Sequence, residues 1–309
     1  MGDYSEREAI DEAVKILGRI YSSVEFGFMD DASGLRIGGR WLLYKIDGTP
    51  ISESMYEGMG VDDLAFRVAA GAATDIIAKG GRPEIVFFSV GIPRSKATQW
   101  IKDIARGIRD FASRNSMTVG GGDTNFVARE GWLDVAILGF TDRPIPNNPL
   151  REGEVVKVSH CLGISSIPAI AHYLGIGKGY LPKVMKSIKR PSLPLNFLHY
   201  SYKVKASTDV SDGLESVRKM LRLSGLSLNL TDPREFLCPE AQEFMETYGI
   251  DVETLLNFMG EEYSIIFTGG SDEGLPLGIL SKGEVGCIYL NGKVLEGGWD
   301  NYIGFLMRK

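Results

Sequence analysis

The sequence predicts two domains of mixed α and β structure. Helix-like and strand-like segments alternate along the 309 residues, a pattern typical of α/β and α+β proteins. Residues 143–150 concentrate proline and asparagine between two ordered-looking regions, which is typical of a linker. The chain is long enough for two average domains, each with its own hydrophobic core. We therefore expect one domain at 1–146 and a second at 147–309.

The first half opens with apolar residues at helical spacing over 10–20, which predict a surface helix with Ser5 as a candidate N-cap. Gly38–Gly39 then separates two strand-like runs and predicts a hairpin whose second strand ends at Asp47. Small, helix-compatible residues predict a helix over 62–79. The remaining predicted elements of this half are a strand at 85–90, a helix at 100–112, a glycine turn at 120–122 and a strand at 133–140.

The second half repeats the alternation of helices and strands. A polar loop rich in proline and lysine separates its first helical stretch from a motif at 205–213, which runs into another helix. The predicted elements are a strand at 154–159, a helical stretch at 164–174, helices at 214–223 and 239–248, and strands at 263–268 and 285–290.

The composition argues against several classes of protein. A formal net charge of −6 argues against a nucleic-acid partner, which needs clustered Lys and Arg to neutralise phosphates. The 3 cysteines and 3 histidines are widely spaced, which argues against a zinc site or a disulfide framework, so free thiols are expected. A polar, acidic N-terminus and the lack of a long apolar run predict a cytoplasmic protein without a membrane segment.

Several aspartates stand where a charge would be desolvated. Asp47 ends an apolar strand and shares a strand face with Lys45. Asp75 lies inside a helix, on a stripe of small residues that includes Gly71. The other informative carboxylates are the pair Asp30 and Asp31, Asp123 after three glycines, and Asp209 and Asp212 around a strand-to-helix turn.

Buried carboxylates that lie close together repel one another and raise one another's pKa unless cations are present. Hard oxygen ligands without Cys or His favour magnesium, calcium or manganese over zinc or copper. Glycine-rich turns beside them can offer backbone N–H groups to phosphate oxygens. Carboxylates, divalent cations and glycine loops are together what phosphoryl transfer requires. The chain has neither a P-loop nor a dinucleotide fingerprint in a usable context, so a Walker or Rossmann site is not expected.

Each of these features also has a plainer interpretation. Asp212 could serve only as a helix N-cap. Gly120–Gly122 could be a simple tight turn. Asp75 could pair with Lys79, four residues further along the helix. The pair Asp30–Asp31 could lie in a solvated loop.

The order of the motifs is more specific than any one of them. The chain carries in turn Asp30-Asp31-Ala32, Asp47 after a strand, Ala73-Thr-Asp75 leading to Gly-Gly-Arg-Pro83, Gly121-Gly-Asp-Thr124, Asp209-Val-Ser-Asp-Gly-Leu214 and Gly260-Glu-Glu-Tyr263. This order resembles the thiamine-monophosphate kinases, a family within the aminoimidazole ribonucleotide synthetase-like superfamily. The resemblance covers nearly the whole chain.

The resemblance implies a two-domain fold of the aminoimidazole ribonucleotide synthetase type. An N-terminal domain that binds ATP and metal would join a second chain through its sheet to form a dimeric barrel, and an α/β domain would follow. The implied activity is ATP-dependent phosphorylation of thiamine monophosphate to thiamine diphosphate, by direct in-line transfer with several magnesium ions. No catalytic residue is implied beyond the metal and phosphate cluster. The implied partners are ATP, thiamine monophosphate and a second copy of the chain.

By the same likeness, individual residues match functional positions of the family. The positions that hold magnesium match Asp31, Asp47, Asp75, Asp123, Asp209 and Asp212. The positions that contact the nucleotide match Gly122, Asp123, Arg143 and Ser211, and substrate-side positions match Glu261 and Tyr302.

The chain departs from the family pattern in its first half. Met29 stands before the aspartate pair in place of the usual glycine, and Lys45 and Ile46 replace hydroxyl residues before Asp47. Ser54 stands where a histidine near the substrate is usual, and we assign it to the substrate site. We assign Lys45 to the ATP site, as a fixed charge that replaces one metal ion or contacts phosphate directly; the plainer alternative is a surface lysine paired with the neighbouring aspartate.

Two other functions remain open, namely another ATP-using enzyme of the superfamily and a catalytically inactive nucleotide-binding regulator. The hydrogenase-maturation branch uses a C-terminal cysteine, whereas the last cysteine here is Cys287. The selenophosphate branch needs a reactive cysteine or selenocysteine near the N-terminus, whereas the first cysteine here is Cys161. The six retained carboxylates argue against an inactive regulator, because an idle metal cluster would only cost stability.

Overall fold

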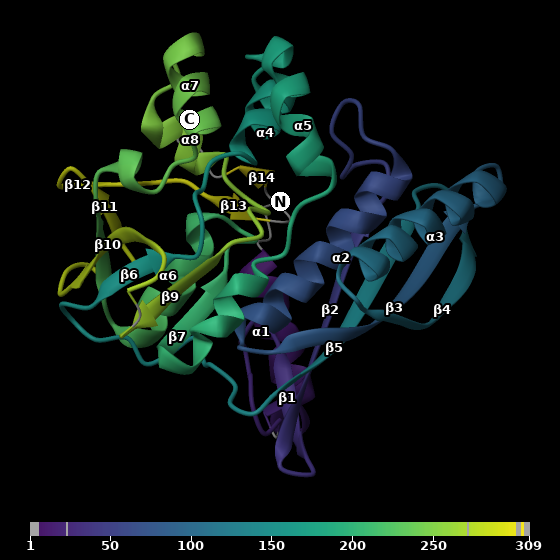
Figure 1. Cartoon of the computed structure of the whole chain (residues 1–309), viewed down its shortest axis with the longest axis horizontal. Coiled ribbons are helices and arrows are strands. Elements are labelled where there is room, and N and C mark those ends of the chain that lie inside the picture. Colours follow the sequence, from purple (N-terminus) through teal and green to yellow (C-terminus); the bar gives the residue numbers. More distant parts are fainter. Residues whose placement is uncertain (1–5, 23, 271, 301–303, 306–309) are drawn as a thin grey trace.

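The computed structural model describes residues 6–22, 24–270, 272–300 and 304–305. It has two main sheets. The strands of one sheet precede residues 143–150 in the sequence and those of the other follow them, and each sheet has its own helices (Figure 1). The predicted mixed α and β class is therefore confirmed. The domain boundary at 146/147 itself stays a prediction.

The first sheet has five strands in the order β1-β2-β5-β3-β4. Only β3 and β4 run parallel; the other neighbours are antiparallel. Helices α2 and α3 cover one face, where Leu43 and Val135 are fully buried, while Ile46 on the other face is 66% exposed. The elements of this half are α1 (Glu6–Ser22), β1 (Ser33–Ile37), β2 (Arg40–Pro50), α2 (Val61–Ala78), β3 (Arg82–Pro93), α3 (Ala97–Arg114), β4 (Thr118–Val127) and β5 (Trp132–Thr141).

The predicted hairpin at Gly38–Gly39 is confirmed, and both glycines have positive φ. Strand β2 continues to Pro50 rather than ending at Asp47, because its antiparallel pairing with β5 extends that far. Helix α1 matches the predicted surface helix, but the candidate cap Ser5 lies outside the described residues.

The interpretation of 120–122 as a tight turn is wrong, because these residues belong to β4, which pairs in parallel with β3. The register shifts here, so that Gly120 has no partner on β3. A Cβ on Gly120 would lie 2.4 Å from the ring of Phe87, and one on Gly122 would lie 2.8 Å from the carbonyl oxygen of Phe88. Because these glycines have no side chain, β4 can lie close to Phe87 and Phe88 of β3, as glycine allows where strands approach closely. Ladder hydrogen bonding has overridden the turn preference of glycine.

The second sheet has seven strands in the order β12-β11-β8-β10-β6-β9-β7. The predicted helices and strands of this half are present, but α5, α8, β8 and β10 were not predicted. The elements are β6 (Val155–Val158), α4 (Ser166–Tyr173), η1 (Lys178–Tyr180), α5 (Leu181–Lys189), η2 (Leu195–His199), η3 (Ser201–Lys203), β7 (Val204–Asp209), α6 (Leu214–Ser224), β8 (Ser227–Leu230), η4 (Pro233–Glu235), α7 (Pro239–Tyr248), α8 (Val252–Asn257), β9 (Ile265–Gly269), β10 (Leu275–Ser281), β11 (Ile288–Leu290) and β12 (Lys293–Val294), with a separate pair β13 (Trp299–Asp300) and β14 (Gly304–Phe305).

Helix α2 lies between the two halves and contacts both (Figure 1). It packs on β2 and β5 of the first sheet and also contacts β7 and β9 of the second. Its last turn contributes Ile77 and Ala78 to a small buried cluster with Phe197 and Phe267 from the second half. Side chains on α2 are therefore positioned by both halves.

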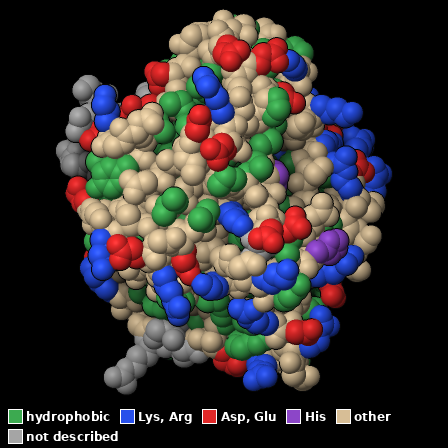
Figure 2. Space-filling view, turned by 60° about the vertical axis from the view of Figure 1, so that its left-hand side comes forward, with side chains coloured by type: hydrophobic (Ala, Val, Ile, Leu, Met, Phe, Trp, Pro, Cys, Tyr) green, Lys and Arg blue, Asp and Glu red, His purple; other side chains and the backbone are tan. Residues whose placement is uncertain are grey.

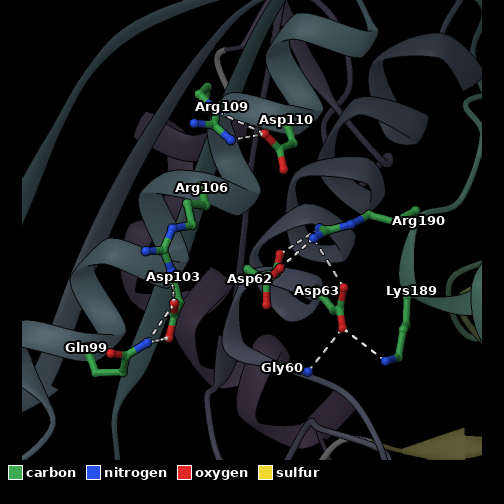
Figure 3. A network of polar contacts seen from close by, with 10 residues as sticks. All are labelled: Gly60, Asp62, Asp63, Gln99, Asp103, Arg106, Arg109, Asp110, Lys189 and Arg190. Atoms are coloured by element: carbon green, nitrogen blue, oxygen red, sulfur yellow. Dashed lines mark hydrogen bonds and ion pairs between the residues drawn. The ribbon is translucent and has the colours of Figure 1, made fainter.

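Ion pairs join the halves at the first turn of α2 (Figure 3). Arg190, which follows α5, lies 2.6 Å from Asp62 and 3.2 Å from Asp63. Lys189 lies 3.4 Å from Asp63. Acidic side chains suit the N-terminus of a helix, and here they also face cations from the other half.

The cysteine prediction is wrong in part, because Cys161 and Cys238 form a disulfide. Their Cα atoms are 4.8 Å apart although 77 residues separate them in sequence. A parallel bridge between Leu162 and Leu237 brings the two segments together, a long-range pairing that cysteine spacing cannot reveal. Cys287 is a free thiol.

Within the described ranges, no helix is both long enough and apolar enough to cross a membrane. Acidic and basic side chains are interspersed over the face shown in Figure 2.

Candidate active site

Three aspartates from distant parts of the sequence converge beside α2. Asp75 lies within α2, Asp31 in the loop before β1, and Asp209 at the end of β7. One carboxylate oxygen from each lies within 4.8 Å of the others. The structure thus brings together three of the six carboxylates predicted to hold magnesium.

Because these carboxylates are buried, their ionisation is unfavourable without a cation nearby. Asp75 and Asp209 are only 3% and 5% exposed. Burial raises the pKa of Asp209 to about 7, and the neighbouring charge of Asp31 adds to the rise. Burial likewise raises the pKa of Asp75 well above its usual range, although Lys45 opposes the rise. Two buried acids that resist ionisation beside a third carboxylate are typical of a functional site.

Lys79 pairs with Asp31 and with its neighbour Asp30. Its side chain is fully buried, with Nζ 2.6 Å from Asp30 and 2.9 Å from Asp31. Burial disfavours its charge, yet the two carboxylates outweigh burial and raise the pKa of Lys79. Burial also opposes ionisation of Asp31, but the charge of Lys79 outweighs it and lowers the pKa of Asp31. The alternatives of an Asp75–Lys79 pair and of a solvated aspartate pair are therefore wrong.

Lys45 is the cation that pairs with Asp75. Its Nζ lies 3.0 Å from Asp75 and 3.3 Å from Asp47. Burial disfavours its charge, but Asp75 and Asp47 raise the pKa of Lys45 well above its usual range. The alternation of β2 correctly predicted that Lys45 and Asp47 share a face. It could not reveal Asp75, which reaches them from the helix packed on that face.

The turn from β7 into α6 places the remaining motif residues. Asp212 pairs with Lys219 at 2.7 Å, and Gly213, not Asp212, is the N-cap of α6, so the capping alternative is wrong. Ser211 donates its hydroxyl to Asp209 at 3.2 Å. A Cβ on Gly213 would lie 2.2 Å from the carbonyl oxygen of Met259, and the φ of 60° also favours glycine.

The predicted nucleotide residues on and after the first sheet do not join this cluster within the chain. Asp123 is exposed on β4, where it accepts a hydrogen bond from Asn125 at 2.7 Å. Gly122 lies on the same strand. Arg143 donates to the carbonyl oxygens of Tyr202 and Val204. Their roles at a nucleotide site stay predictions.

A second polar group surrounds Glu261, a predicted substrate residue. Arg67 on α2 is only 3% exposed and donates to Glu261 and, at 3.0 Å, to the hydroxyl of Tyr263. The guanidinium carbon also lies 5.2 Å from the ring centre of Tyr56. Glu261 and Tyr263 have positive φ, a strained conformation that clusters at functional sites. The Glu261 carboxylate stays 57% exposed.

The other predicted substrate residues are placed less fully. Ser54 lies in the segment after β2 and shares a hydrogen bond with Thr49, which lies near the end of that strand. Tyr302 lies outside the described residues. Gly71 faces this group of carboxylates, as predicted. A Cβ at this position would lie 3.7 Å from Asp47, which is an ordinary contact, so the space does not require glycine here.

Glu262 is a buried acid that the sequence did not reveal. Its Oε1 accepts hydrogen bonds from the backbone N–H groups of Gly163 and Ser165 and from the hydroxyl of Ser165. Burial outweighs these bonds and raises the pKa of Glu262 to about 7. Glu262 thereby ties the loop after β6 to the Gly260–Tyr263 turn.

Glu262→Gln is expected to change the pH dependence of stability. An acid whose pKa is raised in the folded state binds its proton more tightly there, so stability falls as pH rises from about 4.5 to about 7. The wild type should therefore lose on the order of 2 kcal/mol relative to Glu262→Gln between pH 5 and 8. Denaturant unfolding of both proteins at the two pH values measures the difference. Parallel stability curves would contradict this account of Glu262.

Arg67, Lys79, Tyr56 and Glu262 were all missed from the sequence. Lys79 and Arg67 interrupt an otherwise small and apolar stretch, so a charge on that helix was the available signal. Glu262 sits inside a motif already singled out, next to Glu261. Tyr56 had no distinguishing signal.

The donor set at the cluster fits a hard divalent cation. All three oxygens come from carboxylates, the ligands that magnesium prefers. Asp31 Oδ2 is buried and faces the Lys79 ammonium at 2.9 Å, so its charge is already compensated.

Comparisons with known proteins show which sequences this chain is similar to. Residues 29–141 match the family model for the AIR synthase related protein, N-terminal domain. A thiamine-monophosphate kinase of Pyrococcus horikoshii is 27% identical over 241 residues, which is 77% of this chain and 76% of the relative. One from Pyrobaculum calidifontis is 27% identical over 271 residues, or 85% and 88%.

The fold is also similar to that of solved structures. The structure described as AaThiL complexed with AMPPCP and TMP has a TM-score of 0.84 at 22% identity and covers 98% of both chains. The expected resemblance is therefore confirmed in sequence and in fold.

Proposed function

We propose that this chain transfers the γ-phosphoryl group of ATP to thiamine monophosphate, giving thiamine diphosphate and ADP. The observation that carries the proposal is the convergence of Asp31, Asp75 and Asp209 on one point. The similarity to thiamine-monophosphate kinases supports it, since it extends over 77% of the chain for one relative. Phosphoryl transfer depends mainly on positioning and charge neutralisation, which such a cluster is suited to supply.

In this proposal Asp31, Asp75 and Asp209 hold magnesium, which neutralises charge on the ATP phosphates. Asp47 and Asp212 complete the acidic surroundings, and Ser211 orients Asp209 through its hydrogen bond. The acceptor is already a phosphate anion, so the reaction needs no strong general base. The protein then has to hold the γ-phosphoryl group of ATP in line with the phosphate of thiamine monophosphate.

Glu261 is the proposed contact for the acceptor, with Ser54 and Tyr302 as further substrate residues. Arg67 and Asp75 are eight residues apart on α2, or about 12 Å along a helix axis. One rigid helix would thus fix the distance between the acceptor end and the phosphate end of the site. Both ends would depend on how α2 sits between the two halves.

A second copy of the chain is the proposed cover for the open face of the first sheet. Ile46 and Trp132 on this face are 66% and 44% exposed on the described chain. Pairing of two such faces into a barrel would bury them, as expected from the resemblance. It would also give Asp123, Gly122 and Arg143 the opportunity to contact nucleotide across the dimer.

The direct test is a product assay with the purified protein, ATP and Mg²⁺. Thiamine monophosphate should be converted to thiamine diphosphate with one ADP per product, and unphosphorylated thiamine should not be a substrate. ADP formation that depends on a different acceptor would favour another enzyme of the superfamily. Tight ATP binding without turnover would favour an inactive regulator.

Arg67→Gln is expected to weaken binding of the acceptor. Loss of the guanidinium removes the donors that hold Glu261 and Tyr263 in their strained conformations. The KM for thiamine monophosphate should rise about tenfold, equivalent to ~1.4 kcal/mol, with an unchanged KM for ATP. Steady-state kinetics with each substrate varied in turn gives both values.

The matched control is Arg106→Gln, which removes an exposed ion pair with Asp103 on α3. It should leave both KM values unchanged. Equal increases in both KM values for Arg67→Gln would indicate a general structural defect and would contradict the proposed role.

A further inference from the structure

Most carboxylates of the candidate site already have a lysine partner. Lys79 lies between Asp30 and Asp31, and Lys219 pairs with Asp212. Lys45 lies between Asp75 and Asp47. The group of six carboxylates therefore carries three negative charges fewer than the carboxylates alone would give it. These six are Asp30, Asp31, Asp47, Asp75, Asp209 and Asp212, and the three lysines are Lys45, Lys79 and Lys219.

Lys45 differs from the other two lysines in its position. Its side chain is 24% exposed, whereas the side chain of Lys79 is fully buried and that of Lys219 is 58% exposed. Lys45 is also influenced by the charge of Asp209, which belongs to the three-aspartate cluster. The ammonium therefore stands beside the cluster, where Asp47 and Asp75 hold it, at the end of a partly exposed side chain.

The contacts of Lys45 are those that a bridging cation would make. A divalent ion between Asp47 and Asp75 would neutralise the same two carboxylates that now lie 3.3 and 3.0 Å from Nζ. A lysine ammonium carries one charge and three N–H donors, and it cannot leave the site. Two cations cannot share this position, because their repulsion would go uncompensated.

We propose that Lys45 is a resident cation that takes the place of a divalent ion between Asp47 and Asp75. The inference deepens the proposed function, on which it rests for the chemistry of the nucleotide. Divalent binding is then confined to the side of Asp75 that faces Asp31 and Asp209. The ion pairs with Asp47 and Asp75 use two of the three N–H donors of the ammonium. The third donor is available to a phosphate oxygen, so one position of the site needs no metal from solution.

Counting of bound Mn²⁺ tests this inference without any turnover. Equilibrium dialysis of the nucleotide-free protein against MnCl2, with the free ion measured by electron paramagnetic resonance, gives the number of ions per chain. Lys45→Ser should bind one more Mn²⁺ per chain than the wild type, because Asp47 and Asp75 lose their shared partner. Lys45→Gln should do the same, and either variant is informative if the other folds poorly.

Lys205→Ser is the matched control, because Lys205 pairs with Glu154 at 2.5 Å outside the site. It should bind the same number of ions as the wild type. A second readout is the melting temperature with and without MgCl2: Mg²⁺ should raise it more for Lys45→Ser than for the wild type, since binding to the folded state stabilises it.

An unchanged ion count in folded Lys45→Ser and Lys45→Gln, with the same Mg²⁺ effect on melting as in the wild type, would overturn the inference. The counting uses no thiamine monophosphate. A wild-type protein that fails to form thiamine diphosphate would therefore refute the proposed function, while the ion count would still decide the role of Lys45.

Discussion

Asp209→Asn is expected to abolish most phosphoryl transfer while it stabilises the metal-free protein. The amide keeps the shape and can still accept the hydrogen bond from Ser211, but it is a poor ligand for magnesium. The rate of thiamine diphosphate formation should fall at least about a hundredfold. The fold should persist, because no buried cation in the described chain depends on Asp209 alone.

Asp209→Asn should stabilise the metal-free protein although it removes activity, and the reason is the burial of Asp209. Burial and Asp31 raise the pKa of Asp209 to about 7 in the metal-free protein, so its ionisation at pH 8 opposes folding. An uncharged amide avoids that cost. Unfolding in EDTA at pH 8 should therefore require more denaturant for the variant than for the wild type. A variant that keeps full activity would contradict the assignment of Asp209 as a metal ligand.

Lys79→Met is expected to be the most destabilising single change at the site. The fully buried ammonium compensates Asp30 and Asp31 and also donates to the carbonyl oxygen of Ser207 on β7. Removal leaves two buried carboxylates unpaired, which typically costs about 3 to 5 kcal/mol. Denaturant unfolding at pH 7.5 measures the loss in free energy.

Lys205→Met gives the comparison for an exposed pair. Lys205 is 52% exposed where it meets Glu154, and surface pairs contribute about 1 kcal/mol or less. Lys79→Met should therefore be several times more destabilising than Lys205→Met. Equal effects of the two substitutions would show that the buried carboxylates find other compensation.

The sequence allowed prediction of most local elements because their signals are local. Small, helix-compatible residues identified α2, periodicity identified α3, and Gly38–Gly39 identified the first hairpin. Helix α5 was missed although its buried residues recur at helical spacing, because its prolines and lysines were interpreted as a polar loop. Helix α8, with 6 residues, is too short to show a period. The glycine run in β4 was misassigned, because its conformation is set by Phe87 and Phe88 on the neighbouring strand.

The site shows the same division between local and long-range information. The motifs identified Asp31, Asp75 and Asp209, which the structure brings within 4.8 Å. They did not identify their partners, because an ion pair such as Lys79 with Asp31 depends on how a loop packs against a helix 48 residues later. The disulfide between Cys161 and Cys238 was missed for the same reason.

The transfer of label from [γ-³²P]ATP to thiamine monophosphate in the presence of Mg²⁺ tests the proposed activity most directly. The label should appear in thiamine diphosphate, in an amount equal to the ADP formed, and Asp209→Asn should transfer almost none. Label released only as inorganic phosphate, or no label in thiamine diphosphate despite bound ATP, would contradict the account.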